Sequence, residues 1–305
     1  MLENMDKQAI RIGTLVQNTA LPERMGFAEY IKFLLPFGFE SFELSFWQTL
    51  GGVDLAQLAD EVLEALDGSG AIISCVDVFG NPLESGEKDV ETLKALETVI
   101  DNVHRFGTDM VAGFTGRMRG QSIPDSLPRF TEVWMALCDR SAKNDVKVAF
   151  ENCDMGGTWE TGDWNIAHNP AAWELMFDAV KAEEIGLEWE PCHQMVHLID
   201  PIAQLAKWVD KVYHVHGKCA TIRHDIIREY GIDGPKQWAF HRTPGFGDCN
   251  WTDVISILRM AGYEGSIDIE GWHDPVYRGD LEITGQVHAL SYLKRCRGGD
   301  YVPLP

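Results

Sequence analysis

Short apolar runs, rich in β-branched and aromatic residues, alternate along the chain with longer stretches in which apolar residues recur every three or four positions. The first pattern is typical of strands buried on both faces, and the second of amphipathic helices. Eight strands are predicted in this way, at 10–16, 41–47, 71–79 and 109–115 and beginning near 146, 187, 212 and 265. Helices are predicted between them, among others at 25–38, 54–68, 90–107, 171–186, 201–211 and 251–263.

The strict alternation of strands and helices favours a parallel sheet. The 305 residues divided among eight units allow about 38 each, which fits a (β/α)8 TIM barrel slightly above the usual size of about 250 residues. An open doubly wound sheet would usually carry a phosphate loop or a G-x-G-x-x-G run after its first strand, and neither is present. We therefore predict one TIM-barrel domain over 1–305, with long βα loops near 153–168 and 219–250 on its catalytic face.

Composition and charge exclude several classes of protein. The content of 45% hydrophobic and 24% charged residues is ordinary for a globular domain and excludes disorder, collagen and coiled coil. The net charge of −21 disfavours nucleic acid and anionic membranes as partners. No apolar run reaches the roughly 18 residues of a membrane span, and the first residues lack a secretory signal. Seven cysteines without a C-x-x-C pair indicate reduced thiols, so we expect a cytoplasmic protein.

The last four predicted strands all end in side chains that bind metal ions. The carboxyl ends of barrel strands converge on one mouth, where catalytic groups gather. Carboxylates and an imidazole there would suit Mn²⁺, Mg²⁺, Co²⁺ or Zn²⁺, with positions left open for water and substrate. The strand ends carry, in order, Glu151, then Glu190 and His193, then His214 and His216, and finally Glu270.

Each of these residues also has a structural interpretation. A glutamate in an apolar strand can be paired with another side chain, but a lone buried carboxylate is costly, which favours function for Glu151, Glu190 and Glu270. His214 and His216 point to the same face of their strand. We take His216, nearer the strand end, as the ligand and interpret His214 as a histidine of the barrel core.

Further groups near the strand ends leave alternatives open. His193 could bind a substrate hydroxyl or the metal, or be structural. His273 and Asp274 could act as acid or base, or cap the last helix. Lys218 shares the face of His216 and could neutralise an enolate, or be a solvated loop residue. Tryptophans near the strand ends could form walls for a sugar ring or an aromatic aglycone, or belong to the core: Trp47, Trp159, Trp164, Trp189, Trp238 and Trp272.

Such a site can remove a proton next to a carbonyl. A divalent ion on a carbonyl oxygen and the adjacent hydroxyl acidifies the carbon-bound proton, because it stabilises the negative charge that moves onto oxygen. Return of the proton gives isomerisation or epimerisation. If a leaving group lies β to the carbonyl, the same enolate expels it, and the reaction is that of a lyase.

These residues resemble the metal site of the sugar phosphate isomerase/epimerase superfamily, the xylose isomerase-like TIM barrels. The resemblance extends from the first strand to the helix ending near Cys296. It implies an acid/base pair formed by Glu151 and Glu270, and a substrate contact by His193. The sequence departs from the pattern at Cys219, where H-x-K-D relatives have an acid, and in having a glutamate where aspartate is commoner as second ligand. The implied metal ligands are Glu151, Glu190, His216 and Glu270.

Within the superfamily, five runs are similar to the catalytic α subunits of C-glycoside deglycosidases: NIAHNPAAWE, EPCHQ, HVHGK, EGWHDPVY and GGDYVPLP. The resemblance implies a 3-oxo-glycoside substrate, loss of the aglycone by elimination, Mn²⁺ or a similar ion, and a histidine as acid/base, for which His273 is the candidate. It also implies a small β-rich second subunit. We further expect the chain to form an oligomer.

The sequence thus predicts a metal-dependent lyase that acts on a C-glycoside, with Mn²⁺ as the foremost ion. The alternative is a sugar or sugar phosphate isomerase/epimerase. A phosphate would require a basic anchor such as Arg223, Lys218 or Arg242, and an aglycone would require an aromatic wall. Ten dispersed histidines and the charge of −21 disfavour a phosphodiesterase of the endonuclease branch. A converging set of metal-binding side chains disfavours a barrel without catalysis.

Overall fold

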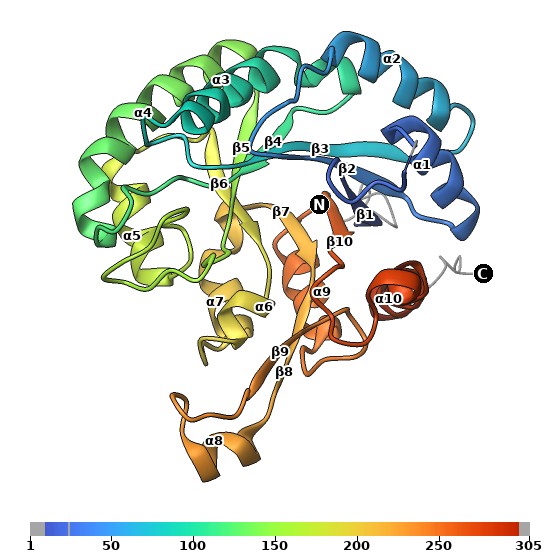
Figure 1. Cartoon of the computed structure of the whole chain (residues 1–305). Coiled ribbons are helices and arrows are strands. Elements are labelled where there is room, and N and C mark those ends of the chain that lie inside the picture. The colour runs from blue at the N-terminus through green and yellow to red at the C-terminus, as the bar shows by residue number, and fades with distance from the viewer. Residues whose placement is uncertain (1–9, 24, 299–305) are drawn as a thin grey trace. The chain divides into compact units, whose positions relative to one another are not determined.

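A computed structural model describes residues 10–23 and 25–298 (Figure 1). The last of the five runs quoted above, GGDYVPLP, lies largely outside these residues. Eight parallel strands close into a barrel in the order β1-β10-β7-β6-β5-β4-β3-β2, which confirms the predicted TIM-barrel fold. Their bounds are β1 (Arg11–Gln17), β2 (Ser41–Trp47), β3 (Ile72–Phe79), β4 (Met110–Gly113), β5 (Lys147–Glu151), β6 (Ile185–Trp189), β7 (Val212–Gly217) and β10 (Ser266–Ile269).

Helices follow the strands, as the apolar periodicity predicts. Their bounds are α1 (Phe27–Leu34), α2 (Leu55–Leu66), α3 (Glu87–Asn102), α4 (Ile123–Asn144), α5 (Pro170–Ala179), α6 (Cys192–Met195), α7 (Pro201–Trp208), α8 (His224–Tyr230), α9 (Trp251–Met260) and α10 (Glu282–Arg297). Short 3-10 turns are η1 (Leu35–Phe37), η2 (Val103–Phe106), η3 (Val209–Lys211) and η4 (Gly279–Leu281). Within the described residues, no helix combines the length and the apolar character that a membrane span requires.

Capping side chains fix where several helices begin. Asp54 accepts hydrogen bonds from two backbone N–H groups at the start of α2, and Asp200 does the same for α7. Ser122 caps α4, which ends at Asp145 in the left-handed conformation. Such caps satisfy N–H groups that have no partner inside the helix, and each contributes about 1 kcal/mol.

The chain divides into two compact units. Of the described residues, the first unit comprises 10–14, 190–210 and 215–298, and the second comprises 15–23, 25–189 and 211–214. In the second unit, strands β2 to β6 pair in parallel in chain order, as the register Phe150↔Leu187 illustrates. In the first unit, β10 pairs in parallel with both β1 and β7.

An aromatic cluster joins helix and sheet in the second unit. Trp134 of α4 lies edge-on against Phe150 of β5, with ring centroids 4.5 Å apart, and Phe130 contacts both rings. The indole N–H of Trp134 donates to the carbonyl of Thr115 at 2.8 Å. Burying each ring contributes about 1.5–3 kcal/mol, so this cluster holds α4 on β5.

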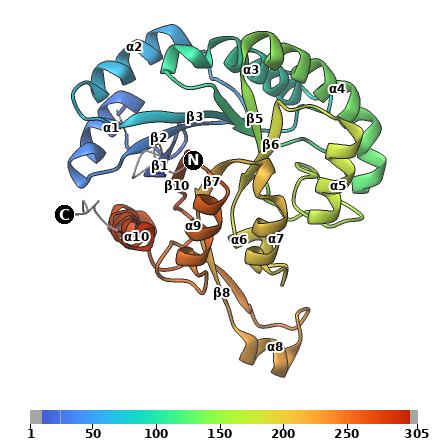
Figure 2. The same cartoon turned by 180° about the vertical axis from the view of Figure 1, so that it is seen from behind.

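The segment 219–250, predicted as a long loop after the seventh barrel strand, has regular structure of its own. It contains β8 (Cys219–Ile222) and β9 (Ala239–Arg242), which pair antiparallel, with α8 between them. Figures 1 and 2 both show this arm, with α8 at the end that lies away from α9. In contrast, residues 153–168 form turns without a helix or a full strand.

Candidate functional site

The pairing of β7 with β10 brings His216 and Glu270 together. Asp268 lies opposite His216 in the register, and the backbone N–H of Glu270 donates to the carbonyl of Gly217 at 3.3 Å. The Glu270 side chain, one residue beyond β10, therefore lies beside the end of β7. Its Oε2 is 3.4 Å from Nδ1 of His216, and both residues are buried.

Lys218 forms a buried ion pair with Glu270. Its ammonium nitrogen lies 2.7 Å from Oε1 of Glu270, and the lysine is only 3% exposed, so the interpretation of Lys218 as a solvated loop residue is wrong. Burial by itself raises the pKa of Glu270, but the charge of Lys218 and the nearby imidazoles of His216 and His273 hold that pKa well below its usual range. Glu270 is therefore a carboxylate at neutral pH.

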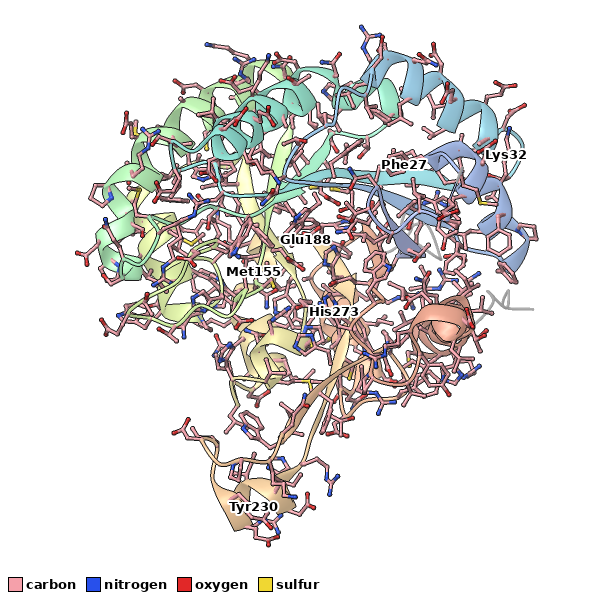
Figure 3. The ribbon with its side chains drawn as sticks, viewed as in Figure 1. Phe27, Lys32, Met155, Glu188, Tyr230 and His273 are labelled. Carbon is pink, nitrogen blue, oxygen red and sulfur yellow. The ribbon has the colours of Figure 1, made fainter. Side chains whose placement is uncertain are left out.

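The loop after β10 carries His273, which is labelled in Figure 3. Nδ1 of His273 lies 3.4 Å from Oε1 of Glu270, while half of the imidazole is exposed. The preceding Trp272 has a φ of 63°, a left-handed conformation that is strained for a bulky residue. Glu282 accepts the Trp272 N–H at 3.1 Å and fixes this strained turn.

Glu190 and His193 form a second pair within the same unit. Glu190 follows β6 directly, and His193 lies in α6, so the two side chains are one helical turn apart. Nε2 of His193 is 2.9 Å from Oε1 of Glu190, and neither residue is more than 3% exposed. The predicted second ligand therefore has an imidazole in contact with it.

His241 joins these two groups, and the sequence analysis did not identify it. Its ring lies edge-on to His193, with centroids 5.0 Å apart, and 5.7 Å from the ring of His273. Burial, with the charge of Lys218 and the two neighbouring imidazoles, lowers the pKa of His241 to about 3, so it is neutral at pH 7. The only signal in the sequence is that His241 lies in a long segment after a barrel strand.

Asp274 has a structural role. Its two oxygens accept hydrogen bonds from the N–H groups of Val276, Tyr277 and Thr243 and from Nε of Arg242, at 2.8–3.0 Å. It therefore ties the loop after β10 to the end of β9. Of the two alternatives for Asp274, acid/base or helix cap, the structure favours neither, because Asp274 anchors a loop.

Two residues considered in the sequence analysis belong to the second unit. Glu151 ends β5 in the second unit and is 4% exposed, so its membership in the ligand set stays a prediction. His214, in the same unit, is 2% exposed and lies with Nε2 3.1 Å from Oε2 of Glu43, so it is buried beside a carboxylate of β2.

The tryptophans divide between the two interpretations offered for them. Trp189 is fully buried and belongs to the core. Trp47 and Trp164 are partly exposed and lie against each other, with ring centroids 5.5 Å apart and Phe114 at the edge of Trp47. This pair, at the end of β2 and in the 153–168 segment, stays a candidate wall for a sugar ring or aglycone.

The donor atoms of the first unit fit a divalent metal ion. Two ligands bound at about 2.0–2.1 Å to one tetrahedral ion are roughly 3.3 Å apart, and Nδ1 of His216 and Oε2 of Glu270 are 3.4 Å apart. The Oε2 atom is also buried without a hydrogen bond of ordinary geometry. Imidazole nitrogen and carboxylate oxygen suit Mn²⁺ or Zn²⁺.

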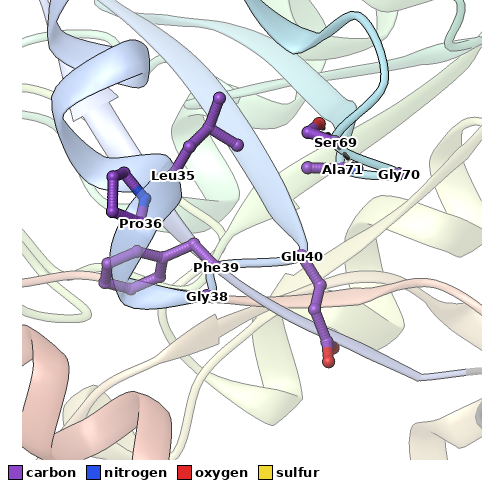
Figure 4. A pocket seen from close by; sticks show the side chains of 8 residues that line it. All are labelled: Leu35, Pro36, Gly38, Phe39, Glu40, Ser69, Gly70 and Ala71. Carbon is purple, nitrogen blue, oxygen red and sulfur yellow. Dashed lines mark hydrogen bonds between the residues drawn. The ribbon is translucent and has the colours of Figure 1, made fainter.

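A separate cavity of about 430 Å³ lies in the second unit at the starts of β2 and β3 (Figure 4). Catalytic groups of a TIM barrel lie at the opposite, carboxyl ends of the strands. Glu40 is the only ionisable residue that lines it, so this cavity does not carry the chemistry described above.

Comparisons with known proteins agree with this architecture. The chain is 22% identical over 296 residues to the uncharacterized protein YfiH of Bacillus subtilis, which covers 87% of this chain and 94% of YfiH. It is 33% identical over 103 residues to an inosose dehydratase of Clostridium tetani, about a third of each protein (31% and 32%). The crystal structure of 3-keto-D-glucoside 4-epimerase YcjR from E. coli matches with a TM-score of 0.68 and 15% identity, covering 94% of this chain and 100% of YcjR. The family model for xylose isomerase-like TIM barrels matches residues 31–296, so the chain belongs to this family.

Proposed function

We propose that the chain is a metal-dependent carbohydrate enzyme that removes the proton next to a sugar carbonyl. Its substrate is a 3-oxo-glycoside, and cleavage of the C-glycosidic bond follows by elimination. The observation that carries the proposal is the buried group formed by His216, Lys218 and Glu270, with the half-exposed His273 beside it. It combines donors for an ion with an imidazole that substrate can reach.

The proposed ion is Mn²⁺, with Mg²⁺, Co²⁺ and Zn²⁺ as alternatives. His216, Glu270 and Glu190 of the first unit would hold it together with Glu151, which ends a strand of the same parallel barrel. When bound, the ion would supply a Lewis acid that stabilises negative charge on the carbonyl oxygen. The ion would also offset the repulsion among the carboxylates that hold it.

We propose different roles for the two outer glutamates. A general base works best when its pKa lies near the working pH. Lys218 and the neighbouring imidazoles hold the pKa of Glu270 well below its usual range even though burial raises it, so Glu270 is suited to be a permanent anionic ligand. We therefore assign the removal of the carbon-bound proton to Glu151. The acid/base role that the family resemblance implies for Glu270 becomes secondary.

Elimination also requires a proton for the leaving group. After the base removes the proton next to the ketone, the electron pair forms the sugar double bond while the bond to the aglycone carbon breaks. The aglycone carbon then takes up a proton, for which His273 is placed at the exposed edge of the group. His193 and the neutral His241 pack against each other beside it and would orient substrate hydroxyls.

The names of similar proteins support this class of chemistry. A dehydratase of an inosose and an epimerase of a 3-keto-glucoside both act next to a keto group. Loss of water and inversion at that position both begin with removal of the adjacent proton. The second candidate is accordingly an isomerase or epimerase, favoured by the similarity in fold to YcjR. A small β-rich second subunit and an oligomeric state remain part of the proposal.

The test measures aglycone release from a 3-oxo-C-glycoside by the Mn²⁺-loaded chain and bound metal by elemental analysis. His273→Ala should reduce release at least about 100-fold, the usual contribution of an acid/base group, with metal content unchanged. The matched control is His224→Ala, an exposed histidine of α8, which should retain full activity. Glu270→Gln should lose both metal and activity. Full activity with stoichiometric metal in Glu270→Gln would refute the site.

A further inference from the structure

A second group of metal-binding side chains is buried in the second unit, on different strands and with different residues from the proposed active site. Glu43 lies on β2, Asp77 on β3, Glu188 on β6 and His214 on β7 (Glu188 is labelled in Figure 3). None of the four is more than 2% exposed. Donor atoms of Glu43, Glu188 and His214 all lie within 4.8 Å of one another.

The charges of this group require an explanation. Three of the four side chains are acids, and the imidazole of His214 is the only one of the four that can carry a positive charge. Isolated carboxylates are costly to bury, and the cost is offset by protons or by a cation.

Asp77 supplies an independent observation. Its Oδ1 accepts a hydrogen bond from the backbone N–H of Phe46 at 3.3 Å. Its Oδ2, although completely buried, makes no hydrogen bond of ordinary geometry, and neither does the buried Oγ of the neighbouring Ser45. The carboxyl group of Asp77 interacts with those of Glu43 and Glu188, which places it beside this group. Buried polar atoms without partners are rare and indicate a missing ion or water.

The distances fit an ion held by these side chains. Nε2 of His214 is 3.1 Å from Oε2 of Glu43, close to the roughly 3.3 Å expected between two ligands of a tetrahedral ion. A fully buried site leaves no place for coordinated water, so the protein must supply all ligands. Four protein ligands in a closed shell are typical of structural zinc sites, and carboxylate and imidazole are both zinc ligands.

We propose that Glu43, Asp77, Glu188 and His214 form a closed, structural binding site for a divalent cation of the Zn²⁺ class. The site is distinct in its residues from the active site proposed above, and it does not depend on that proposal. On β6 and β7 its ligands precede Glu190 and His216 by two residues, so the same strands carry ligands for both sites. The cation would stabilise the fold by neutralising the buried carboxylates.

The test is zinc content after the full-length chain is saturated with Zn²⁺ and freed of excess ion by gel filtration. The wild type should retain about two ions per chain, one at each proposed site. Asp77→Asn and Glu188→Gln should each lose one ion, whereas Glu270→Gln should keep the structural ion. The matched control is Asp89→Asn, a buried aspartate paired with Arg119, which should retain both ions.

The outcomes separate this inference from the proposed function. If the wild type retains a single ion that Glu270→Gln keeps and Asp77→Asn loses, the result supports the structural site and contradicts the active site. If the wild type retains a single ion and only Glu270→Gln loses it, the inference is overturned. If Asp77→Asn does not fold, anomalous diffraction from zinc-soaked wild-type crystals decides the question. A peak about 2.0–2.1 Å from Nε2 of His214 supports the site, and no peak among the four side chains overturns it.

Discussion

Replacing Asp274 with asparagine tests how the loop after β10 is held. Asp274 is 2% exposed, and each of its oxygens accepts two hydrogen bonds, Oδ2 from Arg242 and Thr243 and Oδ1 from Val276 and Tyr277. Asparagine keeps one of the two oxygens, with its two hydrogen bonds, but presents an NH₂ group to the two donors that bind the other oxygen. Losing two hydrogen bonds to a buried carboxylate should lower the free energy of unfolding by about 2–4 kcal/mol.

The pH dependence of this loss follows from the pKa of Asp274. Burial raises that pKa, but the N–H groups of Tyr277 and Thr243 and the guanidinium of Arg242 outweigh burial and lower it. A carboxyl whose pKa is lower in the folded than in the unfolded chain adds stability above its unfolded pKa of about 3.9. The difference between wild type and Asp274→Asn should therefore be constant from pH 8 to 5 and shrink as pH falls below about 4.

Urea-induced unfolding at several pH values measures both effects. The matched control is Asp225→Asn, which removes the carboxylate of an exposed pair with Arg223 in the same unit and should leave the free energy of unfolding unchanged. If Asp274→Asn is as stable as the wild type at pH 7, the anchoring role is refuted. A difference that grows as the solution is acidified would refute the sign of the pKa argument.

Two further substitutions test the buried pair and the barrel packing. Lys218→Met should raise the pKa of Glu270 and lower the free energy of unfolding in urea by about 3–5 kcal/mol, because it leaves a buried carboxylate without its ammonium partner. A loss below about 1 kcal/mol, typical of exposed pairs, would contradict the burial of this pair. Gly113→Ala would place a Cβ 2.3 Å from the carbonyl oxygen of Val78 and should lower the unfolding free energy by about 3 kcal/mol. Gly120→Ala, also at positive φ but in open space, should cost only about 1 kcal/mol, and equal losses in the two variants would contradict the close contact.

The barrel strands were predictable because strands buried on both faces leave continuous apolar runs, as in β3 and β5. The arm formed by β8 and β9 was not. Its four-residue strands are separated by 16 residues that include α8, so the sequence lacks the short turn that marks a hairpin. The arm carries His241, and for that reason this histidine was missed as a member of the site.

The candidate metal ligands were proposed from their positions at strand ends, but their contact partners could not be predicted. Lys218 and Glu270 are 52 residues apart in the chain, and only the pairing of β7 with β10 brings them into contact. The burial of Lys218 depends on this contact and leaves no local pattern. The anchoring role of Asp274 likewise depends on β9, which lies more than 30 residues earlier in the chain.

The proposed function requires that the chain break a carbon–hydrogen bond next to a sugar carbonyl. The most direct measurement is mass spectrometry of a 3-oxo-glycoside with an aromatic aglycone, incubated with the Mn²⁺-loaded chain in D₂O. We expect release of the free aglycone. Deuterium uptake into an intact substrate would instead establish the isomerase or epimerase alternative. If the metal-loaded chain neither releases aglycone nor exchanges deuterium into this substrate, into ketoses or into their phosphates, the claim is contradicted.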